Sequence, residues 1–153
     1  MTAYSSTEYT THTDGPDKNS PSTNNGVVYK YAHYTGTALG TSDVVSLMTI
    51  PAGVRILPQS FIIISDLESS ATVNVGYAAH TSQSDGSAVA VDADAFCSAI
   101  AADSARTVTH FHESGTHDTG YVTTGELVLT LALGAGTAVS ADTFDVHIMY
   151  CKG

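Results

Sequence analysis

The densest group of side chains that could bind a metal is His110-Phe111-His112-Glu113, followed closely by His117-Asp118. Imidazole nitrogens and carboxylate oxygens are the ligands that zinc and similar ions take from proteins. Two histidines that lie two positions apart on a strand point to the same face, as a shared ion would require. The spacing of His110 and His112 therefore raises the hypothesis of a metal site.

The cupins offer a pattern against which this cluster can be tested, since they are jelly rolls whose metal motif also contains His-x-His. That motif has a glycine six residues before the first histidine and a glutamate four or five residues after the second. The corresponding positions here hold Ser104, Thr116 and His117. We therefore assign no metal ligands, and a cupin-like metalloenzyme is kept as a third hypothesis.

Motifs for nucleophilic or phosphate chemistry are missing from the chain. It contains no G-x-S-x-G nucleophile elbow,. The glycines of Gly134-Ala135-Gly136 lack the lysine of a phosphate-binding loop and lie between two expected strands, where a hairpin turn explains them,. Asp92 and Asp94 are explained as residues at the start of a helix. We predict no catalytic residues, no cofactor and no enzymatic activity.

Charge narrows the range of partners. Fifteen acidic residues against five basic ones leave a formal net charge of −10, so a phosphate-binding surface cannot be assembled and nucleic acid is not expected as a partner,. Apolar runs such as Phe61-Ile62-Ile63-Ile64 are far shorter than the roughly 20 residues of a membrane-spanning helix, so no membrane association is expected,.

Cys97 and Cys151 match no disulfide or zinc framework and are predicted to be reduced thiols.

The elements that must position these residues are mostly strands. Residues 1–25 contain no Val, Ile, Leu or Phe and are expected to form an N-terminal arm, either a disordered tail or a segment that becomes ordered against a neighbouring subunit,. Residues 26–153 are expected to form the domain. Residues 92–104 are rich in alanine and place Phe96 and Ile100 at i and i+4, which predicts one short helix or a helical loop. Alternation and turn residues predict strands at 26–35, 43–50, 54–57, 61–65, 71–79, 107–111, 121–123, 126–133 and 143–150,.

Two details of this pattern bear on the topology. Residues 61–65 do not alternate, which indicates a strand buried on both faces or one that passes between two sheets. The many short strands separated by turns predict an all-β fold, an antiparallel jelly roll or β-sandwich with one short helix and an extended N-terminal arm.

Tyrosines are the side chains best suited to bind a partner, because tyrosine offers a large contact area for few rotatable bonds. Tyr4 and Tyr9 lie in the arm, and Tyr29, Tyr31 and Tyr150 lie in expected strands. We predict that these five bind a partner, although a place at the edge of the core would also explain the strand tyrosines. We further expect a trimer whose contacts use residues 26–35 and 143–150.

Residues 45–79 resemble the central part of small virion structural proteins of tailed bacteriophages: an apolar strand, the Pro51-Ala52-Gly53 turn, a buried strand and the alternating V-x-V-G-Y of Val73–Tyr77. The opening MTAYSSTEY, the DADAF at Asp92–Phe96 and the ending LALGAGTAVSADTFDVHIMYCKG extend the likeness. The histidine-rich segment 110–117 has no counterpart in that pattern.

The resemblance implies a jelly-roll decoration (cement) protein that stabilises a phage head as a homotrimer seated on the major capsid protein. It would then be made in the host cytoplasm and lie on the outer capsid surface of the virion. The alternative is a phage adhesin or tail-associated glycan-binding module built on the same sandwich.

Overall fold

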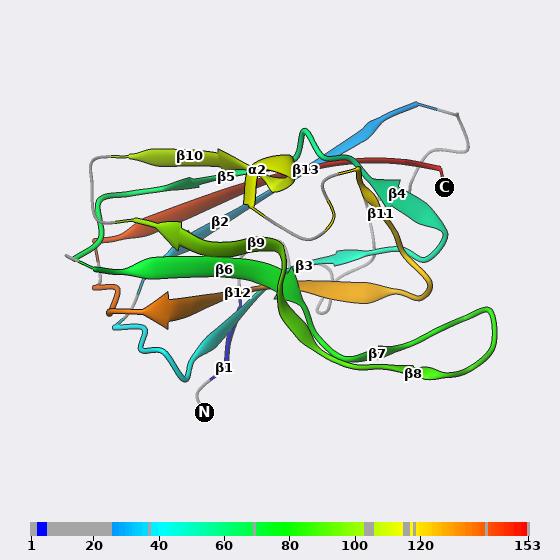
Figure 1. Ribbon diagram of the computed structural model, residues 1–153, viewed down its shortest axis with the longest axis horizontal. Coiled ribbons are helices and arrows are strands. Elements are labelled where there is room, and N and C mark those ends of the chain that lie inside the picture. Colours follow the sequence, from blue (N-terminus) through cyan, green and yellow to red (C-terminus); the bar gives the residue numbers. More distant parts are fainter. Residues whose placement is uncertain are drawn as a thin grey trace.

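The computed structural model describes residues 3–5, 26–36, 38–68, 70–102, 106–114, 117, 119–139 and 141–152. Their strands form two sheets, antiparallel except for one strand pair, that face each other across one hydrophobic core (Figure 1). The predicted all-β sandwich is therefore confirmed. No helix in the described part of the chain is both long and apolar enough to cross a bilayer.

The first sheet has five strands in the order β1-β3-β12-β6-β9. Strand β1 pairs with β3 in parallel, and the other neighbours are antiparallel. The bounds are β1 Ala3–Ser5, β3 Val44–Ile50, β12 Leu127–Ala135, β6 Thr72–Tyr77 and β9 Asp92–Ala101.

The second sheet is organised around its longest strand, β13 (Thr143–Lys152). Strand β2 (Val28–Thr35) pairs along one edge of β13, whereas β5 (Phe61–Ile64) and β4 (Val54–Ile56) pair in succession along the other. Strand β10 (Thr107–His110) then pairs with β5, and β11 (Tyr121–Val122) pairs with β4. This order brings side chains from β2, β13, β5 and β10 side by side on the outer face.

Two smaller elements complete the described structure. The hairpin of β7 (His80–Thr81) and β8 (Ala88–Val89) extends away from the sandwich (Figure 1). The single helical turn α2 (Phe111–Ser114) follows β10 directly, at a position where the sequence predicted the end of a strand.

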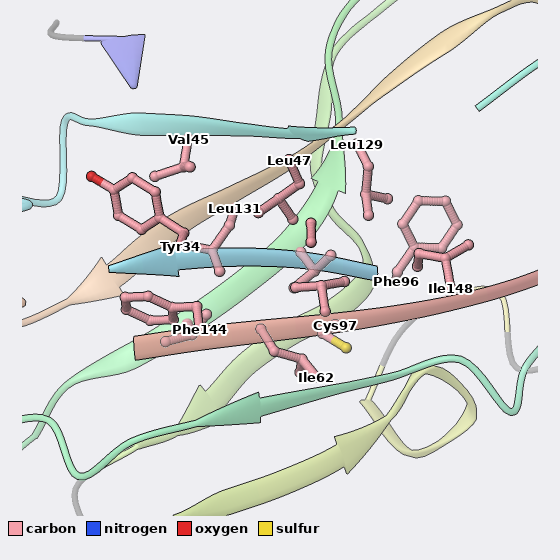
Figure 2. Packing of buried hydrophobic residues seen from close by; sticks show 14 of the residues in the cluster. Tyr34, Val45, Leu47, Ile62, Phe96, Cys97, Leu129, Leu131, Phe144 and Ile148 are labelled. Carbon is pink, nitrogen blue, oxygen red and sulfur yellow. The ribbon is translucent and has the colours of Figure 1, made fainter. Parts of the chain in front are cut away.

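Alternating apolar residues of both sheets supply the core. Val45, Leu47, Leu129 and Leu131 of the first sheet and Ile62, Phe144 and Ile148 of the second are all fully buried, and Figure 2 shows their side chains between the sheets. Burial of apolar area at roughly 25 cal/mol per Å² is the principal force holding the two sheets together.

The predicted helix at residues 92–104 is wrong, because residues 92–101 form strand β9. Two register shifts between β9 and β6 interrupt the alternation, so Ala95, Phe96 and Cys97 are all buried in succession. A Cβ at Gly76 in β6 would lie 2.0 Å from the carbonyl oxygen of Asp92, so only glycine permits this close approach,. Tertiary packing therefore overrides the helical spacing of Phe96 and Ile100.

The glycines at 134–136 do not form the expected hairpin between the last two strands. Strand β12 belongs to the first sheet and β13 to the second, so the chain after Gly136, whose φ is 77°, crosses from one sheet to the other. The Pro51–Gly53 turn also joins strands of different sheets, β3 and β4, and the Thr123 hydroxyl donates to the Pro51 carbonyl (2.8 Å) to hold it.

Strand β5 is buried on one face only. Ile62 and Ile64 point into the core, whereas Phe61 and Ile63 are half-buried on the outer face of the second sheet. The prediction of a strand buried on both faces is therefore wrong at these two positions. The missing alternation has a different cause, because apolar side chains also form part of that outer face.

Candidate partner-binding face

A row of aromatic rings crosses the outer face of the second sheet. The strand registers align Tyr31 of β2 with His147 of β13, His147 with Phe61 of β5, and Phe61 with His110 of β10. Each of these residues lies at an outward position of its strand, because its neighbours along the chain point into the core. We call this row, together with Tyr29, His33 and Asp145, the aromatic face.

Ring contacts connect the row from end to end. The His147 and Phe61 rings are stacked, with centroids 4.3 Å apart and planes 13° from parallel. Tilted contacts follow on both sides, at 5.0 Å between Tyr31 and His147 and at 5.6 Å between Phe61 and His110. The Tyr29 hydroxyl also forms a hydrogen bond with Nδ1 of His147. The rings therefore hold one another in fixed orientations.

Asp145 is the residue of this face whose carboxylate binds two of its neighbours by hydrogen bonds. Its Oδ1 accepts one hydrogen bond from the Tyr31 hydroxyl (2.6 Å) and another from Nδ1 of His33 (2.7 Å). Burial pushes the pKa of the Asp145 carboxyl upward, but the hydrogen bonds from Tyr31 and His33 outweigh it and leave this pKa below its ordinary value,. Asp145 is therefore a stable anion on the surface.

The same contacts shift two neighbouring groups. The hydrogen bond to Asp145 raises the pKa of Tyr31 to about 12, because ionisation would place a phenolate against a carboxylate. Partial burial lowers the pKa of His147, and the negative charge of Asp145 opposes this effect only in part. His147 is thus favoured in its neutral form, in which Nδ1 can accept a hydrogen bond from the Tyr29 hydroxyl.

A shallow groove of about 520 Å³ runs along this face, lined by Tyr29, Tyr31, Ile63, Arg106, Asp145 and His147. A second hollow of about 290 Å³ shares Ile63, Arg106 and Asp145 with it and continues to Ser65, Asp66 and Thr143. Aromatic surface, carboxylates and a guanidinium lie side by side here. Such a surface suits recognition by contact, and it lacks the enclosure that usually surrounds a reacting small molecule.

The five predicted partner-binding tyrosines fall in different places. Tyr29 and Tyr31 are 57% and 44% exposed and belong to the aromatic face. Tyr4 is in β1, at the edge of the other sheet, and Tyr9 lies outside the described residues. Tyr150 is 1% exposed within the core, because it alternates with outward residues on the central strand. Its side chain is therefore not available to a partner, and we withdraw it from the candidates.

Sequence reasoning missed His33, Phe61, Asp145 and His147 as members of the face. A signal was present, because Asp145 and His147 alternate along their strand with the buried residues Phe144, Val146 and Ile148. The pattern shows only that they point outward. Which side chains they meet depends on the order of strands in the sheet.

The structure separates the histidines of the metal hypothesis. The His110 and His112 rings lie 5.5 Å apart, but His117 packs against Tyr121 at 4.6 Å and Phe96 at 6.0 Å. Glu113 accepts a hydrogen bond from the backbone N–H of His110 (2.8 Å), which lowers the pKa of its carboxyl and accounts for its place beside the histidines. Within the described ranges, no three His, Cys, Asp or Glu side chains gather closely enough to hold a metal ion.

Comparison with known proteins finds similar structures but no matching family model or curated sequence. No protein-family model matches the chain, and no curated protein matches it. A chain in the capsid of Ralstonia phage GP4 superposes with a TM-score of 0.69 at 16% identity, over 99% of both chains. A chain in the capsid asymmetric unit of cyanophage Pam1 superposes with a TM-score of 0.52 at 22% identity, over 90% of this chain and 99% of its own. The protein therefore has the fold of chains found in two phage capsids.

Proposed function

We propose that this protein is a non-enzymatic structural component of a phage virion, specifically a decoration (cement) protein that stabilises the head. The observation that carries the proposal is the superposition on a chain of the Ralstonia phage GP4 capsid over 99% of both chains. The two chains are alike from end to end, so the likeness is not limited to one common sheet. In this proposal the protein is made in the host cytoplasm and binds the major capsid protein on the outer capsid surface as a homotrimer.

The aromatic face is the surface that we assign to the capsid contact. Tyrosines are frequent among residues that contribute most to binding energy at protein interfaces. The exposed apolar or aromatic side chains here are Tyr29, Tyr31, Val27 and Val108. The same groove is lined by the charged side chains of Asp145 and Arg106, which can make polar contacts with a partner. The predicted contacts of Tyr4 and Tyr9 in the N-terminal arm are part of the same proposal.

Net charge adds a requirement for the partner. With a formal charge of −10 on each chain, copies of this protein repel one another and favour a partner surface that carries Lys and Arg,. Attachment to the capsid should therefore weaken as salt is added. The Debye length is about 8 Å at physiological ionic strength and shortens with more salt, so the attraction between opposite charges on the two surfaces decreases.

The test is binding of the purified protein to phage particles that lack it. The variant Tyr29→Ala/Tyr31→Ala should lower occupancy at least tenfold, whereas Val91→Ala, an exposed change beside the β7–β8 hairpin, should leave occupancy unchanged. Equal occupancy for all three proteins would exclude the aromatic face as the contact. Density for the protein on the tail and none on the head, in electron microscopy of particles, would overturn the decoration role.

The groove on the aromatic face favours one second candidate, the glycan-binding module of a phage adhesin. Tyr29 and Tyr31 can stack against the apolar face of a sugar ring, and the Asp145 carboxylate beside them can accept hydrogen bonds from sugar hydroxyls,. Binding to a glycan array that is lost in Asp145→Ala, by a protein that does not bind capsids, would favour this function over decoration.

A further inference from the structure

The edge of the first sheet is completed by a strand from the far N-terminal end of the chain. Strand β1 pairs in parallel with β3, in the register Ala3 with Val44, Tyr4 with Val45 and Ser5 with Ser46. On its other side β3 pairs with β12, so β1 occupies the edge position (Figure 1). Without β1, the backbone groups of Val44–Ser46 that face it would have no strand partner.

An open edge of this kind is a site for strand addition. Unpaired N–H and C=O groups on an edge strand accept a further strand from any chain that offers one, and native proteins usually cover such edges. Backbone hydrogen bonds supply most of the affinity in this mode of binding. The edge of β3 is therefore a binding site for a short extended segment, and the chain itself carries a segment that fits it in register.

Chain connectivity allows that segment to come from a neighbouring copy. The next described strand after β1 is β2, which lies in the other sheet, and residues 6–27 separate the two, a span of 22 positions. At 3.3–3.6 Å per residue that span reaches at most about 79 Å. A body of the size of residues 26–152 has a radius of gyration of only about 14 Å. The link is long enough for β1 to reach the edge of β3 in an adjacent subunit.

We propose that β1 is an exchanged strand: in the assembled protein, Ala3–Ser5 of one copy binds the β3 edge of the next copy. This inference rests on the homotrimer of the proposed function. Donating an edge strand to one neighbour and receiving one from the other is a head-to-tail contact, which closes into a ring in a trimer and leaves no β3 edge open. Exchange keeps every backbone hydrogen bond of the β1–β3 pair and adds a link between subunits.

The three-residue length of β1 is consistent with exchange inside an assembly and not with β1 as the only contact between free chains. Isolated strand pairs of this length are marginal in water. Once three copies are held together by other surfaces, each arm meets its neighbour's edge at the high effective concentration typical of tethered segments. The occupant of the β3 edge is therefore a second copy of this chain.

Cysteine cross-linking tests the exchange. Neighbouring strands lie about 4.7–4.9 Å apart, within the range of Cα separations that a disulfide spans, so cysteines at the paired positions 5 and 46 should link. Ser5→Cys and Ser46→Cys are introduced into separate chains that also carry Cys151→Ser, and the two chains are co-expressed. Cys97 is fully buried and stays in place.

Exchange predicts disulfide-linked pairs of unlike chains on a non-reducing gel after mild oxidation. It also predicts that the doubly substituted chain, with both cysteines, gives covalent trimers. Ser98→Cys in β9, at the opposite edge of the same sheet, replaces Ser46→Cys in the matched control and should give no link.

Three results would overturn the exchange. The first is a doubly substituted chain that migrates only as an internally linked monomer. The second is a trimer by light scattering in which positions 5 and 46 do not link at all. The third is equal linking in the Ser98→Cys control. Failure of the decoration role shows separately, because a cross-linked trimer that does not bind phage particles keeps the exchange and excludes that role.

Discussion

The imidazole of His147 lies flat against the ring of Phe61, with centroids 4.3 Å apart and planes 13° from parallel. The two residues come from different strands, and the pairing of β13 with β5 places them directly opposite each other. This stack covers one side of the imidazole, and the resulting burial lowers the pKa of His147. Burial therefore makes His147 harder to protonate in the folded protein than in the unfolded chain,.

Protonation of His147 should contribute to the loss of stability at acid pH. Its pKa in the folded protein lies below the ordinary value of about 6.5, so the unfolded chain binds more protons in that range,. The stabilising contribution of neutral His147 is fully present above about pH 6.5 and is lost as the pH falls below that value. Urea unfolding at pH 7.5 and 5.0 should show a smaller loss on acidification in His147→Gln than in the natural sequence.

The exposed Val91, which lies before β9, provides the control for this measurement. Val91→Ala should lose as much stability on acidification as the natural sequence does. The same loss in His147→Gln as in the other two proteins would show that protonation of His147 is not coupled to folding.

Asp145 should control the ionisation of Tyr31. The Asp145→Asn variant removes the carboxylate that raises the pKa of Tyr31 to about 12, so this pKa should move toward the ordinary tyrosine value of about 10,. Spectrophotometric titration at the tyrosinate absorbance measures the change. Tyr77 is the internal control, because burial is the main cause that raises its pKa to about 12, and its titration should not move. An unchanged titration of Tyr31 would mean that the Tyr31–Asp145 hydrogen bond does not persist in solution.

Phe96 should be among the most costly positions to truncate. Its ring is buried, stacks on Phe111 at 5.2 Å and meets the edge of Tyr121 at 5.6 Å. Phe96→Ala should lower the free energy of unfolding by about 3–5 kcal/mol, since a large cavity is left in a packed core. Val91→Ala, at an exposed site before β9, should change it by less than about 0.5 kcal/mol,. Similar effects of the two changes in urea unfolding would contradict this packing.

The two cysteines should differ sharply in reactivity. Both are free, as predicted from the sequence, but Cys97 is fully buried and Cys151 is partly exposed. Burial, with a smaller contribution from the charge of Glu113, raises the pKa of Cys97 to about 12, so almost no thiolate forms at pH 8,. Alkylation followed by mass spectrometry should label Cys151 in the native protein and Cys97 only after unfolding. Equal labelling rates would show that the core around Cys97 opens readily.

Alternation of apolar and polar residues was enough to predict most strands and the all-β sandwich. It worked at β2, β3, β6 and β13, because a strand with one face in the core repeats every two residues,. The turn at Pro51–Gly53 was equally readable from its residue types. The division into an arm of residues 1–25 and a domain of residues 26–153 stays a prediction, with β1 now located inside the arm.

Only the tertiary structure determined which strands lie next to each other in each sheet, and the aromatic face depends on that order. Residues 92–101 were predicted to be a helix because bulges interrupt the alternation that marks a strand. Residues 61–64 were correctly predicted to be a strand, but their apolar outer face led to the wrong prediction that both faces are buried. The last two strands were expected to pair, yet they lie in different sheets, since pairing between strands is a property of the whole chain and not of the turn that joins them.

The row formed by Tyr31, His147, Phe61 and His110 also depends partly on the local sequence and partly on the tertiary structure. The local sequence determines that each of these side chains points outward. Only the order β2-β13-β5-β10 brings them into one row, because hydrogen bonds between strands far apart in the sequence set that order and leave no trace in the residues on either side,.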